Sequence, residues 1–116
     1  MELITPEPGD AQPVERYRSG GAAVHALAHG TGEAHVYAVH FEPGGEIGVH
    51  PAGYAQLFWV VSGAGWVSGG DGARVPLVAG QGALFRRGEE HAKGSETGMT
   101  AIMIQVADLD AAPPGE

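Results

Sequence analysis

Histidine is the side chain that offers this sequence most of its chemistry. The 116 residues contain six histidines and no cysteine. The lack of cysteine excludes disulfides, thiolate zinc sites, iron–sulfur clusters and cysteine nucleophiles. His50 and His91 lie where glycine-rich turn signals meet strand signals. An imidazole can ligate a metal ion or act as a general base near neutral pH, so both residues are candidates for a ligand pocket or a catalytic site.

Three further residues extend this candidate pocket. Gln56 follows His50 by six residues, an even offset that puts both side chains on one face if the strand between them is unbroken. An inward-facing amide needs a hydrogen-bond partner, which a polar ligand, a water molecule or His50 could provide. Tyr54 lies between the two residues, close to the expected mouth of the pocket. His40 joins the pocket if its side chain points inward.

Short strands must position these residues. The chain has 20 glycines and 8 prolines, spread without a fixed period, and they separate apolar runs by turns. No apolar stripe with helical spacing extends beyond two turns, so helix is a minor component. The pattern predicts an all-β sandwich, barrel or jelly roll with strands at residues 23–29, 34–41, 46–50, 56–62, 66–68, 74–78, 83–86, 91–95 and 100–106.

The first two of these strands are predicted to form a hairpin around the turn at residues 30–33. In that hairpin His29 would face His35 across the strands, with His25 further along the same face. A second metal site and an exposed polar face are both compatible with this spacing. The exposed face is the favoured interpretation, because nothing else in the segment converges on the histidines.

Two motifs in the middle of the chain resemble those of the cupin family. They read Gly44-x5-His50-x-Ala52-x3-Gln56-x6-Gly63 and Gly80-x5-Arg86-x-Gly88-x2-His91-x3-Ser95. All four glycines and both histidines have the spacing of the family. Arg86 and Ser95 replace the proline and the asparagine of the second motif, and we expect them to affect loop shape more than ligation. The resemblance implies a double-stranded β-helix, which is a small jelly-roll barrel.

The resemblance also implies a set of metal-ligand positions. In metal-binding cupins three first-motif ligands and the second-motif histidine hold one divalent ion inside the barrel. Here His50 and His91 keep two positions, Ala52 replaces a histidine, and Gln56 replaces the glutamate. An amide oxygen is a weaker ligand than a carboxylate. Two readings stay open: one Zn, Ni, Fe or Mn ion held by His50, His91 and Gln56, with His40 as a weaker candidate, or a metal-free pocket.

A chain of this length predicts one domain, which we place at residues 14–109 as a single cupin barrel. Residues 1–13 are expected to be an irregular leader and residues 110–116 a flexible tail. The N-terminus has neither the basic nor the apolar region of a secretory signal, and no run approaches the ~20 apolar residues of a membrane span. We therefore expect a cytoplasmic protein with no membrane partner.

Charge limits the partners further. Six basic and 14 acidic residues give a net charge of −8. Such a surface repels phosphates, so we expect no nucleic acid partner. No phosphate-binding loop is found, so we expect no nucleotide cofactor. The expected partners are a small-molecule ligand and a second copy of the chain, because small jelly rolls leave strand edges exposed and residues 56–61 are rich in aromatic and β-branched side chains.

Two functions from different classes follow. In the first, the barrel binds a small organic molecule that His50, His91, Gln56 and Tyr54 orient for oxygenase, isomerase or lyase chemistry. In the second, a metal-free barrel binds or senses a small ligand without catalysis. Retention of both histidines at motif spacing favours the first function, and a storage role fits so short a chain least. Whether the protein is an enzyme stays open at this point.

Overall fold

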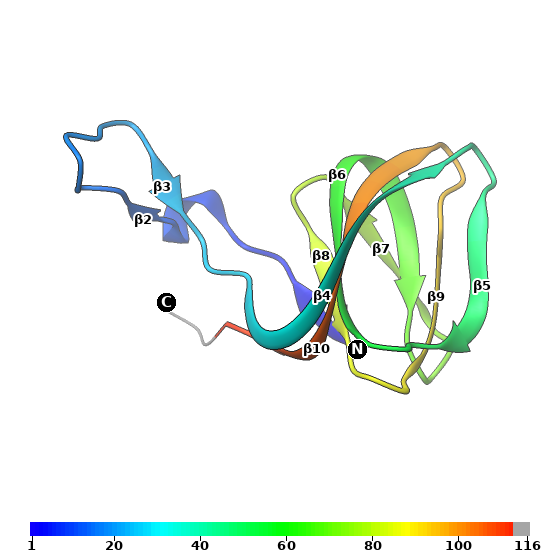
Figure 1. Cartoon of the computed structure of the whole chain (residues 1–116). Helices are drawn as coiled ribbons and strands as arrows, with labels where there is room; N and C mark the ends of the chain where they lie inside the picture. The colour runs from blue at the N-terminus through cyan, green and yellow to red at the C-terminus, as the bar shows by residue number, and fades with distance from the viewer. Residues whose placement is uncertain (113–116) are drawn as a thin grey trace.

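The computed structural model describes residues 1–112, which form strands, turns and one short 3-10 helix (Figure 1). No α-helix occurs within this range, and the all-β prediction is confirmed. In chain order the elements are β1 (Glu2–Ile4), η1 (Pro8–Asp10), β2 (Gln12–Pro13), β3 (Ala23–Val24), β4 (Ala28–Phe41), β5 (Glu46–Pro51), β6 (Ala55–Ser68), β7 (Arg74–Val78), β8 (Gly82–Phe85), β9 (Glu90–Gly94) and β10 (Met99–Ala111).

One strand, β6, takes part in both sheets of a barrel. Its first half pairs with β8 and β10, in a sheet ordered β1-β8-β6-β10-β4. Its second half pairs with β7 and β9, and β9 also pairs with β5. Every pairing is antiparallel. The two sheets enclose an interior, seen on the right of Figure 1, and the fold is the predicted double-stranded β-helix.

A glycine allows β6 to turn this corner. The sequence predicted a break between two strands at residues 63–65, but β6 continues through them. Gly63 has a φ of 80°, and a Cβ there would overlap the carbonyl oxygen of Gly98. Only glycine takes up this backbone conformation at so close an approach without strain. The glycine is therefore a bend within one strand and not the end of it.

The strands bury two apolar clusters, one on each face of the larger sheet. The first fills the barrel and contains Phe41, Phe58, Val60, Phe85 and Met99 among others. The second lies on the outer face of the sheet and is made of Ala55, Leu57, Leu84, Val106 and Leu109. Side chains alternate between the two faces of a strand, so β6 contributes to both clusters. The outer face is consequently apolar as well as the interior.

The predicted hairpin at residues 30–33 is wrong, because β4 runs unbroken from Ala28 to Phe41. Gly30 is required by close packing, since a Cβ there would overlap the backbone oxygen of Asp108 on β10. Ala34 pairs with Val106, and the next aligned pair is Thr31 with Asp108. Between these two pairs β4 advances by three residues and β10 by two, so β4 contains one extra residue. This bulge shifts the alternation of side chains by one residue.

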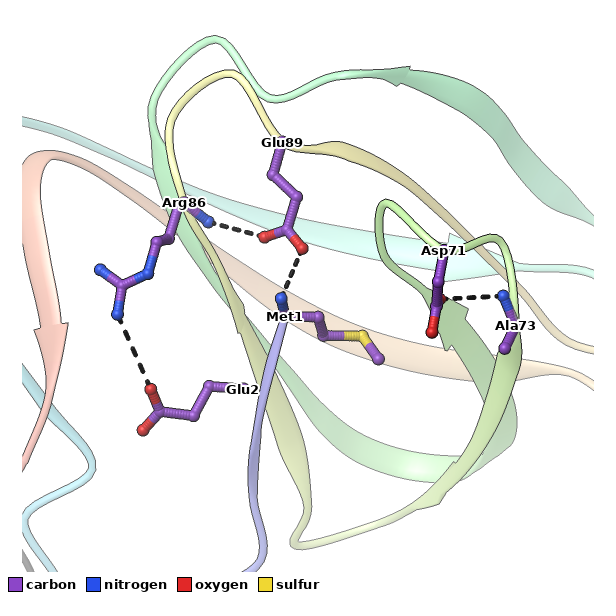
Figure 2. Close-up of polar contacts among 6 residues, drawn as sticks. All are labelled: Met1, Glu2, Asp71, Ala73, Arg86 and Glu89. Atoms are coloured by element: carbon purple, nitrogen blue, oxygen red, sulfur yellow. Dashed lines mark hydrogen bonds and ion pairs between the residues drawn. The ribbon is translucent and has the colours of Figure 1, made fainter.

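The first residues of the chain attach to the barrel. β1, which lies in the predicted leader, pairs with β8 at the edge of the larger sheet. The amino group of Met1 forms an ion pair with Glu89, and the same carboxylate accepts a hydrogen bond of 3.0 Å from the backbone N–H of Arg86 (Figure 2). The Arg86 guanidinium lies 4.0 Å from Glu2. These contacts hold β1 beside the turn between β8 and β9.

The chain then leaves the barrel as an arm, residues 5–27, which carries η1 and the β2–β3 hairpin away from the other strands (Figure 1). Tyr17 and Val24 of the arm are largely exposed. At the other end β10 extends to Ala111, and residues 113–116 of the predicted tail lie outside the described range. Among residues 1–112 no helix has the length and apolar character needed to span a membrane.

The bend in β6 yields a first testable prediction. Gly63→Ala should destabilise the protein more than Gly72→Ala, because both glycines have φ near 80° but only Gly63 is backed by another backbone segment. The shared left-handed strain costs about 1 kcal/mol, and overlap with Gly98 adds to it only in Gly63→Ala. Urea unfolding of both variants measures the difference. Equal losses would mean that the corner does not depend on the close approach.

Candidate functional site

Two histidines meet at the pairing of β5 with β9. His50 and His91 are register partners, their Nε2 atoms are 3.1 Å apart, and their ring centroids are 4.5 Å apart. His50 Nδ1 lies 2.8 Å from the carbonyl oxygen of Gly48, to which it donates a hydrogen bond. With both rings neutral, His91 Nε2–H donates to His50 Nε2. His91 Nδ1 is then an acceptor, and it is buried without a partner among the described residues.

The environment of His91 keeps its ring neutral. The residue is almost fully buried, and the ring of Phe85 packs edge-on against it at 4.6 Å between centroids. Burial, followed by the nearby charges of Lys93 and His50, lowers the pKa of His91 to about 4. His50 by contrast is exposed. The pair therefore joins a buried neutral imidazole to one that faces solvent.

A lysine lies deeper in the barrel, two residues along β9 from His91. Lys93 is the only lysine of the 116 residues, and it is 1% exposed. Its Nζ donates a hydrogen bond to Oε1 of Gln56 and lies 3.7 Å from the sulfur of Met103. The rings of Phe58 and Phe85 face the same nitrogen at 4.9 and 5.3 Å. Burial in this shell lowers the pKa of Lys93 to about 7.

Aromatic side chains form a rim above this interior. His35 stacks between Tyr54 and Tyr37, with centroids 5.8 and 6.4 Å apart. Glu33 accepts hydrogen bonds from His35 and from the Tyr54 hydroxyl, at 2.5 and 3.1 Å. The hydrogen bond to Glu33 raises the pKa of Tyr54. Gln105 is the register partner of both His35 and Gln56, so these side chains share the inward face of the sheet.

The structure brings most of the predicted site residues together. Gln56 bonds Lys93, and His91 packs against Phe85, which also faces Lys93. His50 contacts His91, and Tyr54 lies at the rim. His40 is not among them, because it adjoins inward-facing residues of β4 and its own side chain therefore lies on the opposite face of the sheet. There its Nδ1 is 3.2 Å from Thr100 Oγ1.

The other three histidines divide between two faces. The bulge in β4 leaves His35 at the inward rim, whereas His29 and His25 line a groove on the outer face. His25 Nε2 also lies 2.8 Å from the backbone oxygen of Glu7 in the arm. The expected pairing of His29 with His35 across a hairpin is therefore wrong, since one strand contains both.

The donor set does not fit the divalent ion that the fold family suggests. Oε1 of Gln56 is occupied by the Lys93 amine, and the facing nitrogens of His50 and His91 are engaged with each other. Ala52 places a buried methyl group at the remaining first-motif position. No cluster of three or more histidine or acidic side chains within residues 1–112 could hold a metal ion. A cation placed between Gln56 and His91 would have no carboxylate ligand to offset its charge.

Lys93 is the residue that sequence reasoning missed. A signal for it existed, because His91 and Lys93 are two residues apart on a predicted strand and therefore share a face. Ser95 is next on that face, and its hydroxyl bonds the carbonyl oxygen of Ala64 and the backbone N–H of Gly98. Ser95 thus ties the loop after β9 to β6, as expected for a residue that shapes a loop.

Comparison with known proteins agrees with this architecture. The family model described as Cupin domain matches residues 37–106, which is more than half of the chain. The chain therefore belongs to the cupin domain family. No curated protein matches the sequence.

Three solved structures illustrate the likeness. An uncharacterized conserved protein with a double-stranded β-helix domain from Klebsiella pneumoniae is 22% identical over 90% of this chain and 92% of its own, with a TM-score of 0.59. A conserved protein of unknown function from Streptococcus pyogenes is 18% identical, with 66% of each chain covered and a TM-score of 0.60. A predicted oxalate decarboxylase from Thermotoga maritima is 23% identical over 61% of this chain and 64% of its own, with a TM-score of 0.54. These likenesses establish the fold.

The buried lysine yields a second testable prediction, on pH. The pKa of Lys93 in the folded protein, about 7, lies below the ordinary value of 10.5, so unfolding takes up a proton between these pH values. The free energy of unfolding should therefore rise as pH increases through this window, by up to about 1 kcal/mol per pH unit, and fall as pH decreases toward 7.

Urea unfolding at a series of pH values measures this dependence. Lys93→Met keeps an unbranched side chain of similar length and removes the titrating group, so its free energy of unfolding should change much less over the same window. An equally steep rise in Lys93→Met would assign the dependence to other groups.

Proposed function

We propose that the barrel binds a small organic molecule directly through protein side chains, between the aromatic rim and the Gln56–Lys93 pair. The observation that carries the proposal is the convergence of polar groups on an otherwise apolar interior. Gln56, His91 and Lys93 are each at least 97% buried, and His91 Nδ1 has no partner among residues 1–112. A buried polar atom without a partner, beside an apolar interior, favours a ligand that supplies one.

Each side chain has a role in this proposal. Tyr54, His35 and Tyr37 offer flat faces at the entrance, on which a small planar ligand can stack. Gln56 and Lys93 supply a hydrogen-bond acceptor and donors further in. Within the histidine pair, the nitrogen whose lone pair has no partner among the described residues is Nδ1 of His91, and this atom is the candidate general base if a reaction follows binding. Binding or sensing without catalysis requires only the first two sets of contacts.

A metal-dependent oxygenase, isomerase or lyase is the alternative, and the predicted oxalate decarboxylase among the similar structures is the observation in its favour. For His50, His91 and Gln56 to ligate one ion, the histidines would have to separate and Gln56 would have to release Lys93. Both rearrangements break hydrogen bonds of buried groups, so we favour binding that is independent of metal. A cytoplasmic location stays a prediction from the sequence.

The proposal is tested by ligand binding in the presence of a chelator. A library of small organic acids, aldehydes, ketones and sugars is screened by thermal shift on untagged protein treated with EDTA. Ligands of the barrel should stabilise the wild type, and Gln56→Leu should lose that shift because it removes the buried amide. His40→Ala is the matched control, since His40 lies on the other face of the sheet.

The outcomes separate the two functions. Shifts that survive EDTA and vanish in Gln56→Leu support direct binding. Shifts that need added Zn, Mn or Fe, with near-stoichiometric metal by plasma mass spectrometry that His50→Ala and His91→Ala both lose, would replace it by the metal-dependent alternative. Ligands that bind Gln56→Leu as tightly as the wild type would place the site elsewhere.

We also propose that the outer face of the larger sheet pairs with a second copy of the chain. This face is apolar, and a groove of about 640 Å³ lies on it between the base of the arm and side chains that include Leu57, Ile104 and Leu109. Val36, beside Ile104 in register, is 66% exposed. The projecting two-stranded arm has too few pairs to be stable alone, which supports a second copy as its neighbour.

A charge on this face should therefore break the dimer. Val36→Asp should give a monomer of 11.9 kDa by light scattering at micromolar concentration, where the wild type has twice that mass. Val49→Asp is the matched control, because Val49 is 67% exposed and belongs to β5 in the other sheet. A monomeric wild type, or a folded Val36→Asp variant that remains a dimer, would contradict the proposal.

A further inference from the structure

We propose that Lys93 is a nucleophilic amine that forms an imine with a small aldehyde or ketone inside the barrel. This inference rests on the proposed function, because it requires that a small molecule enters between the rim and the Gln56–Lys93 pair. It adds the chemical class of the ligand, a carbonyl compound, and the atom that attacks it, Nζ of Lys93.

The placement of the lysine is the main support. Lysine side chains almost always reach solvent, yet the single lysine of this chain is 1% exposed. None of the ion pairs among the described residues includes Lys93. The side chain that accepts its hydrogen bond is the neutral amide of Gln56. A structural lysine in such a position would require a carboxylate, so the absence of one points to a chemical role for the amine.

The shell around Nζ suits the reactive form of the amine. Phe58, Phe85 and Met103 surround it with apolar atoms, which disfavour the ammonium and leave the nitrogen lone pair available. The hydrogen bond to Gln56 holds one N–H and so orients the nitrogen. Nucleophilic lysines are activated in this way, by desolvation in an apolar pocket.

Met103 connects the amine with the aromatic rim. The sulfur of Met103 lies 3.7 Å from Nζ, and the flexible side chain of Met103 is itself only partly buried. Tyr37 is the register partner of Met103 on β4 and belongs to the aromatic rim. Tyr37, Met103 and Lys93 are therefore neighbours in turn, and the proposed imine requires that a small carbonyl compound passes Met103 to reach the amine.

The reaction is balanced without any further reagent. The neutral amine attacks the carbonyl carbon, a C–N bond forms, and the carbonyl oxygen takes up a proton to give a carbinolamine. The nitrogen then loses its remaining proton as the hydroxyl leaves with it as water, and a C=N bond results. No electrons are gained or lost, and addition of water reverses the step.

Reductive trapping tests the inference. The wild-type protein is incubated with glyoxylate or acetaldehyde and sodium cyanoborohydride, digested with a protease that does not require lysine, and mapped by mass spectrometry. The chain contains two primary amines, Lys93 and the α-amino group of Met1, so Met1 is an internal reference. We expect an adduct at Lys93 that forms about tenfold faster in the folded protein than in the urea-unfolded protein.

Variants make the result specific. Lys93→Arg has a side chain of similar length but no primary amine, so it should give no adduct beyond that at Met1. Gln56→Leu removes the group that orients the amine and should slow the adduct at Lys93, whereas His40→Ala should not change it. If Lys93→Arg does not fold, the position of the adduct in the wild-type peptide map still decides the question.

Each outcome has one meaning. Selective labelling of Lys93 in the folded protein supports the imine. Labelling of Met1 alone, or of Lys93 only after unfolding, overturns it. The same compounds could shift the melting temperature of the wild type but not of Gln56→Leu, and leave no adduct at Lys93. That result would support direct binding and overturn the imine. If neither shift nor adduct involves Gln56 or Lys93, both proposals fail.

Discussion

The course of β6 through both sheets is the constraint on which the rest of this structure depends. Because the strand bends at Gly63 without ending, its first half aligns β8 and β10 while its second half aligns β7 and β9. The alternation of side chains along this strand decides which residues enter the barrel. It turns Gln56 and Phe58 inward and Leu57 outward, and so builds the site and the apolar outer face together.

Inside this frame a lysine amine lies where metal-binding members of the family hold their ion. Cupins that bind a metal surround it with imidazoles and a carboxylate, whereas this barrel has a lysine amine bonded to the amide that takes the place of that carboxylate. The substitutions fit one another, since an amide can accept from an amine without trapping it as a full ion pair. A barrel of this kind can bind or modify a carbonyl compound with protein groups alone, which is the chemistry that we propose.

In this proposal one face of the larger sheet binds the small molecule and the other face binds a second copy of the chain. The inward face carries the rim and the buried polar groups, and the outer face carries the groove beside the arm. The bulge between Ala34 and Thr31 on β4 divides the histidines between them, with His35 at the rim and His29 on the outside. The extra residue thus decides which face of the sheet each of these two histidines occupies.

The sequence by itself determined the all-β class through its many glycine-separated apolar runs, and the resemblance of its two motifs to those of cupins implied the barrel and the nearness of His50 to His91. The structure explains why the motif glycines are needed, because all four have positive φ. The sequence could not determine which glycines end a strand: Gly30 and Gly65 look like turns in one dimension and instead allow close contacts with Asp108 and Gly94. The partner of Gln56 was equally hidden. Lys93 is 37 residues away, and only closure of the two sheets brings its amine to that amide.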